Sequence, residues 1–160
     1  MTIVGVDPGL SGALAFYEGG MILIRDMPTR QDFVNRKLRN VIAERALVDL
    51  LRERTQPGDI LVIEQVSGMP GQSGPAAFTF GYGVGVVTAA ALSAGLTLER
   101  VHPSTWKAAL GLKTADKSAA RALAAKQFPT SAHLFARVKD DGRAEAALIA
   151  WWGWLTRGAM

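Results

Sequence analysis

Four acidic side chains stand at positions from which they could do chemistry together. Asp7 directly follows one short apolar run, and Glu64 ends a second one. Asp141 and Glu145 are spaced i and i+4, so on a helix they would share one face, with Cβ atoms about 5–6 Å apart. An acid at the end of a core strand is costly to bury without a cation or several hydrogen-bond donors. The sequence therefore predicts that these carboxylates meet at one site.

Gathered carboxylates repel one another, by about 4 kcal/mol per pair at 4 Å and an effective dielectric of 20. A hard divalent cation offsets this repulsion, and a set of oxygen ligands favours Mg²⁺ or Mn²⁺ over zinc. Two such ions about 3.5–4 Å apart support phosphodiester cleavage. Each acid taken singly has an ordinary structural explanation, as a turn residue, a surface acid or a helix cap. Their combination is less easily explained in this way, and it favours a site for a hard divalent cation, Mg²⁺ or Mn²⁺.

The elements that would position these acids follow from the order of apolar runs and turn residues. Residues 2–27 predict a three-stranded antiparallel meander, because Gly and Pro residues interrupt three short apolar runs. Residues 29–40 are polar and basic, and we interpret them as an exposed connection. Residues 41–54 have apolar side chains at helical spacing. Residues 59–66 are apolar without alternation, which predicts a strand covered on both faces.

The second half of the chain alternates helices with one more strand. Ser104 or Thr105 is expected to cap a short helix, and Asp116 a longer one. The order of elements predicts a single α/β domain over residues 1–160, with a mixed sheet flanked by helices. The expected elements are a Gly/Pro/Ser-rich loop over 67–75, helices over 76–94, 106–110, 117–128 and 141–156, a strand over 96–102, and a weakly structured connection over 131–139.

The composition is typical of one globular domain with its own core: 160 residues, of which 49% are hydrophobic and 20% charged. The absence of cysteine excludes disulfides and thiolate metal sites, and it fits a reducing cytoplasm. We see no signal peptide, and the most apolar segment, residues 84–98, is too short to span a bilayer. We therefore expect a cytoplasmic protein without a membrane partner. The net charge of +4 favours a polyanionic partner such as nucleic acid.

Four blocks of the sequence resemble, in order, the RuvC family of Holliday-junction resolvases, and most closely its phage members. The blocks are IVGVDPGLSGALAF, LVIEQV, VHPSTWKAALGL followed by ADKSAARALAAKQFP, and DDGRAEAALIA, and they extend over nearly the whole chain. The resemblance implies an RNase H-like fold with a mixed five-stranded sheet and a homodimer. It also implies a metal-dependent endonuclease of DNA recombination and repair, which resolves four-way junctions, and other branched DNA, by paired nicks.

The resemblance also implies which acids are catalytic. Carried over residue by residue, they are Asp7, Glu64, Asp141 and Glu145. The fourth block departs from many bacterial members, which have two Asp residues at closer spacing. This departure leaves Asp140 as an alternative to Asp141, and the helical spacing to Glu145 favours Asp141.

Basic side chains would hold the DNA. The family has lysines on its late helices, which Lys107 and Lys117 match, and their role would be to hold the scissile phosphate or stabilise its developing charge. The resemblance thus implies that Lys117 is also catalytic. Other cations would extend a phosphate-binding surface, and a second basic segment within 29–40 is expected near the duplex arms. The expected DNA-binding residues are Lys107, Lys113, Lys117, Arg121, Arg36 and Lys37.

Two other functions fit the same sequence. A non-catalytic module would bind branched DNA without nicking it. A nucleotide-binding protein of the actin-like fold also has a first hairpin that turns near an acid and glycines, although this chain is short for the two lobes of such proteins.

Overall fold

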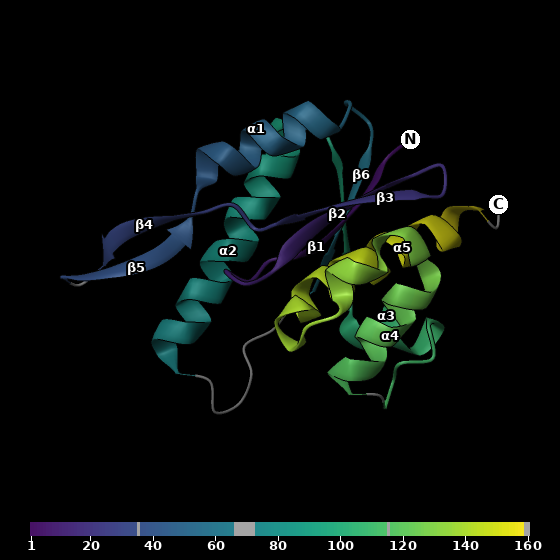
Figure 1. The fold of residues 1–160 in the computed structure, drawn as a ribbon. Coiled ribbons are helices and arrows are strands. Elements are labelled where there is room, and N and C mark those ends of the chain that lie inside the picture. Colours follow the sequence, from purple (N-terminus) through teal and green to yellow (C-terminus); the bar gives the residue numbers. More distant parts are fainter. Residues whose placement is uncertain (35, 66–72, 115, 159–160) are drawn as a thin grey trace.

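The main sheet of the protein has five strands in the order β3-β2-β1-β6-β7 (Figure 1). The computed structural model describes residues 1–34, 36–65, 73–114 and 116–158. Strands β1, β2 and β3 pair antiparallel, whereas β1, β6 and β7 pair parallel, so the sheet is mixed, as the sequence predicted. The five strands are β1 (Ile3–Asp7), β2 (Ala13–Glu18), β3 (Met21–Asp26), β6 (Ile60–Glu64) and β7 (Thr97–Val101).

Helices cover both faces of this sheet, which confirms the predicted α/β layering (Figure 1). Alternate residues of β1 enter two cores: Ile3 packs with the side chains of α5, and Val4 and Val6 pack with those of α1 and α2. Burial on both faces explains why this strand is apolar without alternation. The helices are α1 (Glu44–Arg54), α2 (Gly74–Ser93), α3 (Pro103–Ala109), α4 (Lys117–Gln127) and α5 (Asp141–Gly158), with 3-10 turns η1 (Pro129–Phe135) and η2 (Val138–Asp140).

Helix α5 lies in direct backbone contact with the middle of the sheet. A Cβ atom on Gly5 would overlap the carbonyl of Ala146 and would lie 2.9 Å from the Cα of Ala150. A Cβ atom on Gly142 would lie 2.9 Å from Oδ2 of Asp7. Two glycines thus allow the first turns of α5 to pass over the end of β1, where the first candidate acid stands.

The segment interpreted as an exposed connection, residues 29–40, is instead a hairpin of β4 (Thr29–Val34) and β5 (Lys37–Ile42). This expectation was wrong because most side chains on both faces of the hairpin are exposed, so no alternation of apolar and polar residues marks its strands. The hairpin extends away from the main sheet as a separate two-stranded ribbon (Figure 1).

The structure tests the predicted helix caps and connections one by one. The cap of α4 is Asp116, as predicted, because its Oδ1 accepts the backbone N–H of Ala119 at 3.0 Å. The cap of α3 is His102 and not Ser104 or Thr105, since Nδ1 of His102 accepts the Ser104 N–H at 3.3 Å. The connection expected to be weakly structured holds the 3-10 turns η1 and η2. Most of the predicted loop 67–75 lies outside the described residues.

Helix α2 is longer than the apolar segment singled out in the sequence. Its 20 residues are long and apolar enough to cross a membrane by length and composition alone, and the segment 84–98 overlaps only its second half. A single helix of this kind is weak evidence for a membrane, since core helices of soluble proteins have the same length and composition. One side of α2 packs into the core through Gly83, Val87, Ala90 and Ala91.

Candidate active site

The first two candidate acids leave the sheet side by side. Strands β1 and β6 are parallel neighbours, with Val6 opposite Ile63, and the next residue of each strand is an acid. Since parallel strands end at the same edge of a sheet, Asp7 and Glu64 lie together at that edge. Helix α5 begins over the same edge, which adds Glu145 from its second turn.

The surroundings of Asp7 disfavour the ionised form of its carboxyl. Burial raises the pKa of its carboxyl, and the negative charge of Glu145 raises it further. The backbone N–H of Gly9 donates to Oδ1 at 3.2 Å and lowers the pKa, as do the charges of Lys117 and Lys107. Burial is the largest of these effects, so the local environment favours a cation beside this carboxylate.

Glu64 is also buried near other negative charges, but its hydrogen-bond donor is a side chain and not the backbone. Burial raises the pKa of its carboxyl, and the charges of Glu145 and Asp7 add to this effect. The indole Nε1–H of Trp106, a fully buried side chain on α3, donates to Oε1 at 2.7 Å and lowers the pKa. The sequence analysis missed this role of Trp106. The available signal was its place directly before a lysine in the third block.

Two lysines reach the carboxylates from the later helices. The Lys107 ammonium lies 3.3 Å from Oε1 of Glu145 and 5.1 Å from the centre of the Trp106 ring. The Lys117 ammonium lies 3.8 Å from Oδ2 of Asp141, and its side chain is mostly exposed. Together with Glu145, these lysines line a small cavity of about 40 Å³ beside the acids.

Asp141 stands one helical turn before Glu145 and has basic neighbours. Arg121 of α4 forms an ion pair with its Oδ1, and Lys117 approaches its Oδ2. The repulsion that raises the pKa values of Asp7 and Glu64 comes mainly from Glu145. The fold thus brings three of the four predicted acids into one electrostatic group and places Asp141 at its border.

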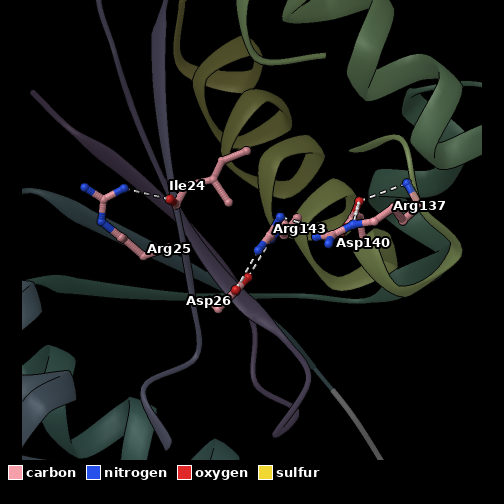
Figure 2. A network of polar contacts seen from close by, with 6 residues as sticks. All are labelled: Ile24, Arg25, Asp26, Arg137, Asp140 and Arg143. Atoms are coloured by element: carbon pink, nitrogen blue, oxygen red, sulfur yellow. Dashed lines mark hydrogen bonds and ion pairs between the residues drawn. The ribbon is translucent and has the colours of Figure 1, made fainter. Parts of the chain in front are cut away.

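Asp140 belongs to a separate network of hydrogen bonds and ion pairs with arginines, which Figure 2 shows. It is 1% exposed and accepts hydrogen bonds from Arg137, with Nη2 to Oδ1 at 2.8 Å. Arg143 lies 3.5 Å from the same oxygen and binds both oxygens of Asp26 on β3 at 2.6 Å. The Arg137 guanidinium holds the pKa of Asp140 below its usual value. Of the two alternatives left by the sequence, Asp141 is therefore the one whose carboxylate stands beside Lys117.

The basic residues expected to bind DNA fall into two groups. Lys107, Lys117 and Arg121 belong to α3 and α4 next to the acids, and Lys113 is exposed in the turn between these helices. Arg121 is engaged by Asp141, and the expectation that it contacts phosphate has to account for this ion pair. The second group, Arg36 and Lys37, lies on the ribbon, at the turn and at the start of β5.

The donor set suits a hard divalent cation. Asp7, Glu64 and Glu145 offer carboxylate oxygens only, and the raised pKa values of the first two mark a local excess of negative charge. Among the described residues, no three acidic or histidine side chains are gathered closely enough to form a ready metal cage. In the structure as it stands, Lys107 supplies countercharge to Glu145.

Comparison with known proteins bears on the fold. No protein-family model matches the chain, and no curated protein sequence matches it. Two solved structures are similar over almost the full length of both chains. Thermus thermophilus RuvC in complex with a Holliday junction substrate has a TM-score of 0.65 and 17% identity, covering 99% of this chain and 96% of that one. A second Thermus thermophilus RuvC structure has a TM-score of 0.62 and 18% identity, covering 99% and 97%. The chain therefore has a RuvC-like fold.

Proposed function

We propose that this chain is a metal-dependent endonuclease that resolves four-way DNA junctions, and other branched DNA, by paired nicks. One observation carries the proposal: Asp7 and Glu64 stand at one edge of a RuvC-like sheet, and the charge of Glu145, which Lys107 pairs with, acts on both. Burying like charges together costs stability, and a nuclease site gives this arrangement a purpose. A similar protein was solved with a Holliday junction substrate, which supports branched DNA as the substrate class.

In this proposal the acids Asp7, Glu64, Asp141 and Glu145 hold two Mg²⁺ or Mn²⁺ ions. Bound divalent ions supply activation of water and neutralisation of phosphate charge in phosphodiester hydrolysis. The indole of Trp106 fixes one oxygen of Glu64 and leaves the other free to serve as a ligand.

Lysines of the same site would position the DNA. Lys107 and Lys117 stand within reach of the carboxylates, so a phosphate bound there would replace acidic partners that they now have. Lys117 is the better candidate for the scissile phosphate, because its side chain is more exposed than that of Lys107. Its charge would stabilise the negative charge that develops on the phosphate during cleavage.

Paired nicks need two catalytic clusters, and the four acids of one chain make one. We therefore propose a homodimer that works on DNA in the cytoplasm, akin to the phage members of the RuvC family. Exposed apolar side chains on α2, such as Phe78 and Leu92, offer surface for a second copy.

The decisive assay compares a synthetic four-way junction, a fork and a linear duplex, each with and without Mg²⁺, and repeats the junction with Mn²⁺. We expect nicks in the junction only when a divalent ion is present. The rival proposal, a module that binds branched DNA without cutting it, would be supported by tight junction binding with intact strands under all these conditions.

A further inference from the structure

The ribbon formed by β4 and β5 carries cations that have no acidic partner among the described residues. Residues 29–42 include four basic side chains and one acid, a net charge of +3. Arg36, Lys37 and Arg39 are exposed, and no described acidic group lies within 4.0 Å of them. Arg30 differs, because Asp32 and Glu44 both form ion pairs with it. The cations toward the tip of the ribbon are thus free to meet an external anion.

The base of the ribbon is fastened to the body of the protein. Nη2 of Arg30 lies 3.6 Å from Oε2 of Glu44, the first residue of α1. The hydroxyl of Tyr82 on α2 donates to Oε1 of the same Glu44 at 2.6 Å. A two-stranded ribbon alone is marginally stable in water, so these contacts give it a defined direction.

A groove runs from the base of this ribbon to the loop that follows Asp7. It is a cavity of about 510 Å³ that begins at Pro8 and Gly9, directly after the candidate catalytic Asp7. It continues between Arg39 of β5 and the first turns of α2, where Ala76 lines it. A polyanion that leaves the acids along this groove would reach Arg39 first and the tip of the ribbon next.

We propose that this groove and the β4–β5 ribbon bind the sugar-phosphate backbone of a duplex DNA arm as it leaves the catalytic site. This inference rests on the proposed function. Charge complementarity favours DNA as the occupant, because Arg36, Lys37 and Arg39 have no acidic partner among the described residues. A six-residue strand is about 20 Å long, which corresponds to roughly six base pairs of duplex. A two-stranded ribbon also fits the width of the major groove.

The first test measures how salt affects binding of a four-way junction to the non-cleaving Asp7→Asn protein. Replacing Arg36, Lys37 and Arg39 together with Gln should reduce the salt slope by about one per residue and weaken binding roughly fivefold per lost contact near 0.15 M salt. The control is Arg45→Gln on α1, an exposed arginine paired with Asp49, which should change neither quantity. An unchanged slope in the triple variant would overturn the inference.

The second test uses the absence of cysteine to map the contact. A single Lys37→Cys substitution, loaded with a tethered iron chelate, should cut the junction arm several base pairs from the branch point, whereas Arg45→Cys should not. The alternative partner of the ribbon is a second copy of the chain, because the apolar side chains of Phe33 and Leu38 are exposed and paired across it. Cleavage of the protein and none of the DNA would show that the ribbon contacts a second copy of the chain. A triple variant that becomes monomeric while its salt slope stays unchanged would show the same. Either result would overturn the inference.

These outcomes are separate from those of the proposed function. If the unmodified protein nicks the junction with Mg²⁺ and the ribbon variants bind and cut as well as it does, the nuclease proposal stands and the ribbon inference fails. If the unmodified protein binds the junction through the ribbon and never cuts, the catalytic proposal alone fails.

Discussion

Replacing Trp106 with Phe isolates one hydrogen bond at the candidate site. The indole fills a fully buried position on α3, and its Nε1–H donates to Oε1 of Glu64 at 2.7 Å. Phenylalanine keeps an aromatic ring there and removes the donor. The carboxylate of Glu64 then faces Glu145 and Asp7 with less compensation, so its pKa rises further above its ordinary value.

The expected loss of stability depends on pH. A hydrogen bond to a charged group contributes about 1.5–3 kcal/mol, and the smaller ring leaves a gap that costs about 1 kcal/mol more. At a pH well above the raised pKa of Glu64, where the carboxyl is ionised, we expect the free energy of unfolding to fall by about 3 kcal/mol. Because the pKa of Glu64 is raised, its protonation stabilises the fold at low pH, and this contribution is lost as pH rises through the folded-state pKa. At a pH below that raised pKa the bond is a neutral one, and the loss should shrink to about 2 kcal/mol.

Urea unfolding at the two pH values, followed by circular dichroism, measures this difference. Trp154→Phe is the matched control, since Trp154 is 40% exposed and packs on Tyr17 with ring centres 5.5 Å apart. Its effect should be the same at both pH values. If Trp106→Phe also lost the same free energy at both, the indole would not be bonded to an ionisable carboxyl, and the electrostatic account of this site would be refuted.

Three further predictions follow from the same geometry. Asp7→Asn should lower Mg²⁺-dependent cleavage at least about 100-fold while junction binding persists, as strand-nicking and gel-shift assays would report; normal nicking would contradict the assigned site. Asp140→Asn should lower the free energy of unfolding by about 1.5 kcal/mol because the buried carboxylate accepts charge-assisted hydrogen bonds from the exposed Arg137, whereas Asp141→Asn should mainly reduce cleavage; the reverse pattern would exchange their roles. Gly5→Ala should cost more than about 3 kcal/mol in urea unfolding because its Cβ overlaps α5, whereas Gly81→Ala, in open space on α2, should be neutral or stabilising.

The ends of the strands could be predicted because they are encoded locally. Asp7 and Glu64 each follow an uninterrupted apolar run, and turn residues or polar residues stop the strands there. The ribbon at 29–42 could not be predicted, since a hairpin exposed on both faces has no alternation to reveal it. Its cations were visible as a basic segment, but the groove that runs from Arg39 to the loop after Asp7 was not.

The sequence by itself determined which residues end the core strands, where α4 and α5 begin, and that acids would need compensation for burial. Tertiary structure decided which of those acids meet. Asp7 and Glu64 are neighbours only because β1 pairs with β6, and Glu64 finds its donor in Trp106, 42 residues away. It also separated Asp140 from Asp141, because the turn before α5 directs one carboxylate to Arg137 and the other toward Lys117. Contacts between distant segments depend on how the helices pack on the sheet, and a pattern read along one strand or helix contains no information about that packing.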